Sequence, residues 1–109
     1  MISPEEVEAI SGELAEGLRR LYGPRLQALI LYGSWARGDA GPESDVDYLV
    51  VLDGYEGFSK ELNRIIEISC EVGLKHDVFV SAQPISWDRY EGAEELFLEE
   101  VRREGRKVA

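Results

Sequence analysis

Residues 31–52, LYGSWARGDAGPESDVDYLVVL, decide how the chain is expected to fold and where its chemistry lies. An apolar run ends at Gly33 and Ser34, a polar loop rich in glycine follows, and Asp45 and Asp47 open a second apolar run. Charged groups are avoided in buried positions unless they are paired or bind a metal. Two carboxylates at the start of a buried strand therefore indicate chemistry rather than packing.

The two halves of this stretch suit different parts of one ligand. Alternate residues of a strand point to the same side, so Asp45 and Asp47 present two carboxylates on one face. Both stay ionised at low cost only if a cation lies between them, and Mg²⁺ is typically held by one or two carboxylates together with substrate phosphates. Gly33 lets the main chain approach a phosphate, and a helical turn from Ser34 would direct N–H groups and a hydroxyl toward it.

Asp77 is the candidate for a third carboxylate. It opens a later apolar run, 77–81, as Asp45 and Asp47 open theirs. If the two strands are neighbours that start level, Asp77 can share the same metal and help to deprotonate an attacking hydroxyl. Two metal ions would then stabilise the attacking and leaving oxygens of an in-line displacement.

The rest of the chain predicts strands alternating with helices. Ser3 can cap a first helix, with Pro4 in its first turn and Glu6 completing a capping box, and the helix ends at Gly23. The other expected elements are strands at 26–32, 45–52 and 77–81, a turn at 34–37 capped by Ser34, a helix at 58–72 ended by Gly73, a loop at Pro84, and a last helical region from Ser86, strongest at 94–104. The inward-facing helix positions are Val7, Ile10, Leu14, Leu18, Leu21, Leu62, Ile65, Ile66, Val72, Phe97, Leu98 and Val101.

This arrangement favours the α/β (α+β) class, with a small mixed sheet of three to four strands and helices packed on it. A length of 109 residues predicts a single domain over 1–109. The net charge of -10 argues against direct binding of nucleic acid and suits divalent cations or basic partners. No apolar run approaches the length of a membrane span, and the start of the chain lacks the pattern of a secretory signal. The single cysteine, Cys70, is expected in the core and is consistent with the cytoplasm.

Gly33, Ser34, Asp45 and Asp47 together spell G-S-x10-D-x-D, with Asp77 in a later apolar run. This pattern resembles that of the DNA polymerase β-type nucleotidyltransferase superfamily. The A-R-G at 36–38 and the ending F-L-E-E-V-R-R-E-G at 97–105 are similar to its minimal nucleotidyltransferase (MNT) branch. Proteins of this branch are often paired with a HEPN protein as toxin–antitoxin systems.

The resemblance implies the nucleotidyltransferase fold and a role for each motif residue. Gly33 and Ser34 would grip the triphosphate, Asp45 and Asp47 would bind two Mg²⁺ ions, and Asp77 would bind the catalytic metal and serve the incoming hydroxyl. Similar proteins of the toxin-paired branch transfer AMP from ATP to a tyrosine of the HEPN toxin. The resemblance therefore implies an antitoxin that adenylylates a HEPN-type partner, and the small size suggests that the partner completes the site.

Two residues near the motif admit more than one interpretation. Arg37 could bind the nucleotide by neutralising the triphosphate, or it could pair with Asp39 or Glu43. His76 neighbours Asp77 in sequence but would point to the opposite face of a strand. A structural or solvent-facing role is therefore expected for His76.

Three functions are consistent with the sequence. The first is a metal-dependent nucleotidyltransferase that uses ATP and acts on a partner protein in the cytoplasm. The second is a binding module that neutralises its partner by complex formation, with the carboxylates as a relic. The third is transfer to a small molecule such as an aminoglycoside, which the small size disfavours. Whether the chain forms oligomers is open.

Overall fold

The computed structural model describes residues 2–41, 44–92 and 95–109 of the chain. The elements are α1 Pro4–Tyr22, the 3-10 helix η1 Gly23–Arg25, β1 Leu26–Tyr32, α2 Ser34–Arg37, β2 Val46–Leu52, α3 Phe58–His76, β3 Val80–Ser86, α4 Trp87–Gly92, α5 Leu96–Glu104 and β4 Arg106–Lys107. Among these residues, no helix is long and apolar enough to cross a membrane.

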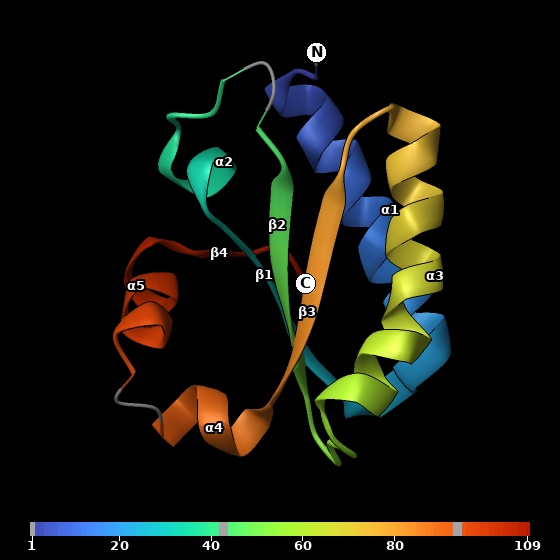
Figure 1. Cartoon of the computed structure of the whole chain (residues 1–109), viewed down its shortest axis with the longest axis vertical. Helices are drawn as coiled ribbons and strands as arrows, with labels where there is room; N and C mark the ends of the chain where they lie inside the picture. The colour runs from blue at the N-terminus through green and yellow to red at the C-terminus, as the bar shows by residue number, and fades with distance from the viewer. Residues whose placement is uncertain (1, 42–43, 93–94) are drawn as a thin grey trace.

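The described strands form one mixed sheet with the order β3-β2-β1-β4. β1 is antiparallel to β2 and β4, whereas β2 and β3 run parallel, with α3 as the connection between them. Figure 1 shows α1 and α3 against one face of the sheet and α4 and α5 against the other. The predicted mixed sheet with helices packed on it is confirmed.

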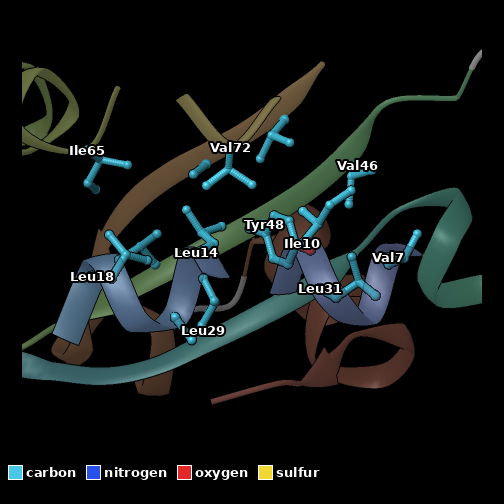
Figure 2. Close-up of a cluster of buried hydrophobic side chains, with 14 of the residues drawn as sticks. Val7, Ile10, Leu14, Leu18, Leu29, Leu31, Val46, Tyr48, Ile65 and Val72 are labelled. Carbon is cyan, nitrogen blue, oxygen red and sulfur yellow. The ribbon is translucent and has the colours of Figure 1, made fainter. Parts of the chain in front are cut away.

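α1 supplies one side of the larger core. The Ser3 hydroxyl accepts a hydrogen bond from the N–H of Glu6 at 3.1 Å, which fixes the predicted start of the helix. Leu21, predicted to face inward, is exposed, and Tyr22 is buried instead because it lies a full turn after Leu18. The buried side chains labelled in Figure 2 come from α1, α3 and the facing strands: Val7, Ile10, Leu14, Leu18, Leu29, Leu31, Val46, Tyr48, Ile65 and Val72.

The second core lies on the other face of the sheet, under α5. Leu98 and Val101 of this helix are buried, as predicted, against alternate residues of the strands. Phe97, predicted to face inward, is 46% exposed and contacts Tyr32 edge to face, with ring centroids 5.5 Å apart. Because both faces are covered, β2 is buried along nearly its whole length, as its continuous apolar run predicts.

α3 continues beyond its predicted end at Val72. A Cβ at Gly73 would lie 2.6 Å from the carbonyl oxygen of Val78, so this glycine allows a close approach of the chain and does not stop the helix. The helix ends at His76 because Asp77, with φ of 53°, takes the left-handed conformation that caps it. Ile66 and Cys70, predicted in the core, are exposed on this longer helix.

The third strand begins later than predicted and includes Pro84. The N–H of Val46 donates to the carbonyl of Phe79, so Phe79 and alternate residues after it direct their main-chain groups toward β2. Pro84 belongs to the other set, which faces the free edge of the sheet. A proline is tolerated there because no ladder hydrogen bond is lost. The loop predicted at Pro84 is therefore wrong.

The end of the chain returns to the sheet, which the sequence pattern did not indicate. Arg106 and Lys107 form β4 beside β1, and the N–H of Leu29 donates to the carbonyl of Ala109 at 3.0 Å. Ser86 ends β3 and does not begin a helix, so the predicted last helical region consists of α4 and α5. Residues 93 and 94, within that predicted region, lie outside the described residues.

Candidate active site

Asp47 lies in the middle of the sheet near one end. Its partner on β1 is Tyr32 and its partner on β3 is Ser81. Val46 and Tyr48 point into the core under α1, so Asp47 points to the opposite face, where it is half-buried. Asp45 directly precedes β2 and is exposed.

Gly33 brings the main chain directly against the carboxylate of Asp47. Its φ of 76° and ψ of -156° fall in a region that only glycine adopts readily. A Cβ at this position would lie 2.7 Å from Asp47 Oδ2. Conformation and space therefore both require glycine here, and the two halves of the motif are in contact.

The turn after Gly33 is α2, which begins one residue earlier than the predicted cap implies. The carbonyl of Gly33 accepts hydrogen bonds from the N–H groups of Ala36 and Arg37 at 3.1 Å, so Gly33, not Ser34, is the N-cap. Within the described part of the chain the Ser34 hydroxyl makes no capping hydrogen bond, and the residue is half-buried beside Gly33. The predicted helical turn at 34–37 is otherwise confirmed.

The loop between α2 and Asp45 is held by Ser44. The Ser44 hydroxyl accepts a hydrogen bond from the N–H of Gly41 at 2.9 Å, and the indole N–H of Trp35 donates to the Ser44 carbonyl at 3.4 Å. These bonds fix the described ends of the loop. Pro42 and Glu43 are outside the described part of the chain, so the predicted pairing of Arg37 with Glu43 lies there too.

The carboxylate of Asp47 lies in an environment that disfavours its charge. Burial, and then the negative charge of Asp45, raise the pKa of Asp47, while Arg37 opposes them. Burial and the charge of Asp47 also raise the pKa of Tyr32. Within the described residues neither Asp45 nor Asp47 forms an ion pair. Two close carboxylates without a protein cation are a suitable donor set for a hard divalent ion.

Arg37 lies beside the motif but is already paired. Its Nε is 3.1 Å from Asp39 Oδ2, and its Nη1 is 3.8 Å from Glu104 Oε2 of α5. The hydrogen bond from Arg37 to Asp39 raises the pKa of the guanidinium. Of the alternatives predicted for Arg37, the structure therefore contains the ion pair with Asp39. A triphosphate would have to compete with both carboxylates for this side chain.

The predicted position of Asp77 is wrong. The residue is the exposed left-handed cap of α3 and precedes β3 by several positions, so it does not open a strand. It lines a pocket with Cys70, Leu74 and Phe79 on the α3 side of the sheet edge. Across the described residues, no group of three or more His, Cys, Asp or Glu side chains is placed to hold a metal. Its role as a third ligand stays a prediction that this conformation does not support.

His76 connects α3 to α1. Its Nε2 is 2.7 Å from Glu13 Oε2 and its Nδ1 is 3.4 Å from Glu6 Oε2. The side chain is only 12% exposed. The expected structural role is confirmed, although the residue lies on a helix and not on a strand.

Two groups near the motif could not be predicted from the sequence pattern. Ser81 is the neighbour of Asp47 on β3, and the only sequence signal is a polar residue inside the apolar run that becomes the strand. Glu104 reaches Arg37 from the end of α5, which no local pattern indicates. Glu104 lines a pocket next to the motif, together with Tyr32, Gly33, Arg37 and Phe97.

Replacing Gly33 by Ala is expected to destabilise the fold and the site together. The strained backbone costs about 1–3 kcal/mol, and the new methyl group must displace the Asp47 carboxylate. We expect the free energy of unfolding in urea to fall by this amount and ATP binding to weaken at least about tenfold. Gly12→Ala is the control, because nothing lies within 4 Å of a Cβ there and the helix should gain stability. Equal stability of Gly33→Ala and the natural chain would contradict the assigned contact.

Asp47→Asn is expected to raise thermal stability in a pH-dependent way. Because the pKa of Asp47 is raised in the folded state, ionising this group destabilises the native chain as the pH rises through that pKa. The variant removes this effect. In metal-free buffer its Tm should exceed that of the natural chain at neutral pH, and the difference should shrink as the pH falls to the range where Asp is protonated in both states. A Tm difference that stays constant across this pH range would show that ionisation of Asp47 is not the cause of the change in stability.

Comparison with known proteins agrees with this geometry. The family model described as nucleotidyltransferase domain matches residues 12–103. A protein of Methanocaldococcus jannaschii named "Putative protein adenylyltransferase MJ0141" is 33% identical over 103 residues, covering 94% of this chain and 99% of the relative. A second protein of that organism, "Putative protein adenylyltransferase MJ0604", is 34% identical over 70 residues, which is 64% of each chain.

Solved structures share the fold. A toxin–antitoxin crystallised with AMP-PNP has a TM-score of 0.64 at 20% identity, covering 91% of this chain and 72% of that one. A mutant of the toxin–antitoxin MntA-HpeT gives 0.63 at 17% identity with the same coverage, 91% and 72%. A nucleotidyltransferase structure from Sulfolobus solfataricus gives 0.60 at 17% identity, with 95% and 77% covered. At these identities the likeness concerns the fold alone.

Proposed function

We propose that this chain, which belongs to the family of nucleotidyltransferase domains, transfers AMP from ATP to a hydroxyl group of a partner protein. The observation that carries the proposal is the close approach of Gly33, at the start of the α2 turn, to the Asp47 carboxylate. It supports a site in which the turn would bind phosphate and the carboxylates would bind a metal. The choice of ATP and of a protein acceptor is supported by the relative named as a protein adenylyltransferase, which this chain matches over 99% of that relative's length.

Gly33, Ser34 and Arg37 are proposed to hold the triphosphate. Gly33 offers a main chain without a side chain, so a phosphate can approach closely. The Ser34 hydroxyl, which caps no helix among the described residues, can donate to a phosphate oxygen. Arg37 can add a bidentate contact once it leaves Asp39 and Glu104.

Asp45 and Asp47 are proposed to hold Mg²⁺, with two ions implied by the family resemblance. The divalent ion supplies charge neutralisation and Lewis acidity when bound. Asp45 directly precedes β2 and Asp47 lies within it, and neither carboxylate forms an ion pair among the described residues. Burial and the charge of Asp45 raise the pKa of Asp47, and a bound cation would relieve both effects.

The proposed reaction is a displacement at the α-phosphorus of ATP. A bond forms between this phosphorus and the acceptor oxygen, and the bond to the oxygen that bridges to the β-phosphate breaks. Pyrophosphate leaves, and the hydroxyl proton passes to solvent. The part of this chain is to orient the triphosphate at Gly33 and Ser34 and to present the carboxylates to the reacting centre.

The partner is proposed to be a toxin that this chain neutralises as an antitoxin in the cytoplasm. Structural neighbours described as toxin–antitoxin proteins support this role, and the HEPN class of the toxin is taken from the resemblance of the motif. The proposal predicts that modification and neutralisation occur together.

The test is transfer of label from ATP to protein. The intact chain is incubated with Mg²⁺ and an extract of its own cells, with ATP labelled in parallel at the α- or the γ-phosphate. We expect label on a protein from α-labelled ATP only, and none in the presence of EDTA. Label from γ-labelled ATP would indicate phosphorylation, and no label from either would contradict the proposal.

A second function is favoured by the position of Asp77. Because the described residues contain no cluster of three carboxylates, the chain could neutralise its partner by binding alone. The two functions differ in the behaviour of a chain with Asp45→Asn and Asp47→Asn. Neutralisation of the toxin in cells by this variant would favour binding alone, and loss of neutralisation would favour transfer.

A further inference from the structure

The end of α5 carries a carboxylate that contacts Arg37, the arginine proposed to bind the triphosphate. Oε2 of Glu104 lies 3.8 Å from Arg37 Nη1, and Oδ2 of Asp39 lies 3.1 Å from Arg37 Nε. Arg37 and Glu104 line the same pocket as Gly33. The proposed triphosphate site therefore contains an arginine that already has two anionic partners.

These two contacts involve both edges of the guanidinium that could hold a phosphate through two N–H groups. Nε and one Nη form the first edge, and the two Nη groups form the second. Asp39 engages Nε and Glu104 faces Nη1, so each edge has one nitrogen beside a carboxylate. Arginine typically binds phosphate through two parallel N–H groups of one edge. A bidentate contact with the triphosphate therefore requires that at least one carboxylate leaves.

Glu104 is the carboxylate that leaves first. Its contact with Arg37 is the longer of the two, and Asp39 also accepts a hydrogen bond from Arg37 Nε. Glu104 has a second cation, because its Oε1 lies 3.5 Å from Arg103 Nη2. Among the described residues Asp39 pairs with Arg37 alone. The charge of Glu104 would thus stay paired when Arg37 moves away, which lowers the cost of separating them.

The main chain fixes the position of Glu104. Gly105 directly follows it, and the N–H of Gly105 donates to the carbonyl of Val101 at 2.7 Å. A Cβ at Gly105 would lie 2.7 Å from Cγ2 of Ile30 on β1, so this glycine lets the end of α5 pack closely on the sheet. Glu104 is therefore presented to Arg37 by a fixed helix end, and rotation of the two side chains is enough to open the contact.

Arg37 belongs to the candidate active site and is not a remote surface residue. Burial, and then the charge of Asp45, raise the pKa of Asp47, and the charge of Arg37 opposes them. Arg37 therefore acts on the carboxylate that Gly33 approaches. A carboxylate that engages Arg37 can control how the site receives an anion.

We propose that Glu104 is a positioning residue that holds Arg37 away from the triphosphate in the empty site, and that ATP binds by displacing this carboxylate from the guanidinium. The inference rests on the proposed function, which places the triphosphate at Gly33, Ser34 and Arg37. Only molecules in which Arg37 is released bind ATP with full affinity, so the contact lowers the apparent affinity of the site.

Calorimetric titration of the full chain with ATP and Mg²⁺ tests the proposal. Glu104→Gln keeps the size of the side chain and removes its charge. Because exposed ion pairs contribute little, we expect this variant to bind ATP about two- to fivefold more tightly than the natural chain. Glu100→Gln is the matched control, since Glu100 lines the same pocket but forms no ion pair with Arg37 in the described structure. At physiological salt its gain should stay within about 1.5-fold.

A second arm tests whether the effect passes through Arg37. In a chain that carries Arg37→Gln, adding Glu104→Gln should strengthen ATP binding no more than Glu100→Gln does. In AMP transfer, Glu104→Gln should lower the KM for ATP by the factor found in the titration and leave kcat unchanged, because it removes a competitor of binding and touches no reacting group. A purely structural role of Glu104 would not depend on Arg37.

Three results would overturn the proposal: ATP binding that Glu104→Gln leaves unchanged or weakens, an equal gain from Glu100→Gln, or the same gain in the chain without Arg37. AMP transfer together with unchanged ATP binding in Glu104→Gln would overturn the role of Glu104 and leave the proposed function intact. Conversely, the expected affinities without AMP transfer would support the role of Glu104 and contradict the proposed function. Absence of ATP binding by the natural chain would contradict both.

Discussion

A chain carrying Asp45→Asn and Asp47→Asn should lose nucleotidyl transfer by about 10³-fold or more. Asn keeps the size of each side chain but removes both negative charges, so a divalent cation loses the donors that would hold it beside the triphosphate. The rate of AMP transfer from α-labelled ATP to the partner measures this loss.

The fold of this variant should remain intact. Burial and the charge of Asp45 raise the pKa of Asp47, so removing both carboxylates relieves an unfavourable charge, and the Tm in metal-free buffer should equal or exceed that of the natural chain. Asp88→Asn, at an exposed residue of α4 without an ion pair in the described structure, is the matched control and should keep full activity. More than a tenth of the natural rate in the double variant would contradict the assigned role.

Glu61→Ala should produce a large loss of stability. Glu61 is fully buried at the start of α3, where its carboxylate accepts hydrogen bonds from the Tyr22 hydroxyl at 2.9 Å, Arg25 at 3.1 Å and Arg64 at 3.0 Å. Breaking a buried ion pair on one side costs about 3–5 kcal/mol. Arg25 and Arg64 are about one third exposed and can return to water, so we expect a loss of about 2–3 kcal/mol.

Urea denaturation of Glu61→Ala measures this loss, with Glu56→Ala as control. Glu56 pairs with Lys60 and Arg64 at a more exposed position, so its replacement should lower the free energy of unfolding much less than that of Glu61. Burial alone would raise the pKa of Glu61, but the N–H of Glu56, Tyr22 and Arg64 lower it overall. The contribution of Glu61 is therefore present above the ordinary pKa of Glu and is lost as the pH falls through the lower folded pKa. If the free energy of unfolding fell equally in the two variants, burial of Glu61 would not contribute to stability.

The elements predicted well are those with a complete local signal. α1 has a cap, a first-turn proline and a helical apolar pattern, and β1 and β2 are continuous apolar runs bounded by turn residues. The errors concern residues whose conformation is set by contacts with residues that are distant in the sequence or by their place in the sheet. Gly73 resembles a helix stop, but it lies against Val78, and Pro84 resembles a loop residue, but it lies on a free sheet edge.

The positions of Asp47 and Gly33 follow from local patterns for a related reason. Strand alternation turns Asp47 away from Val46 and Tyr48, and Gly33 follows from the turn that must end β1. The position of Asp77 could be predicted only by knowing where β3 begins. Because β3 begins later than predicted, Asp77 lies outside the strand. Glu104 approaches Arg37 only because α5 folds back over the sheet, so no pattern near either residue indicates the pair.

Calorimetric titration of ATP, with and without Mg²⁺, tests the central claim most directly, because it needs no acceptor. If Asp45 and Asp47 hold the metal that bridges to the triphosphate, Mg²⁺ should strengthen ATP binding to the natural chain about tenfold or more. In the double Asn variant this gain should vanish, while metal-free ATP should bind at least as well as to the natural chain, because two repelling charges are gone. The same Mg²⁺ dependence in both proteins, or none in the natural chain, would contradict a metal-dependent nucleotidyltransferase site at these carboxylates.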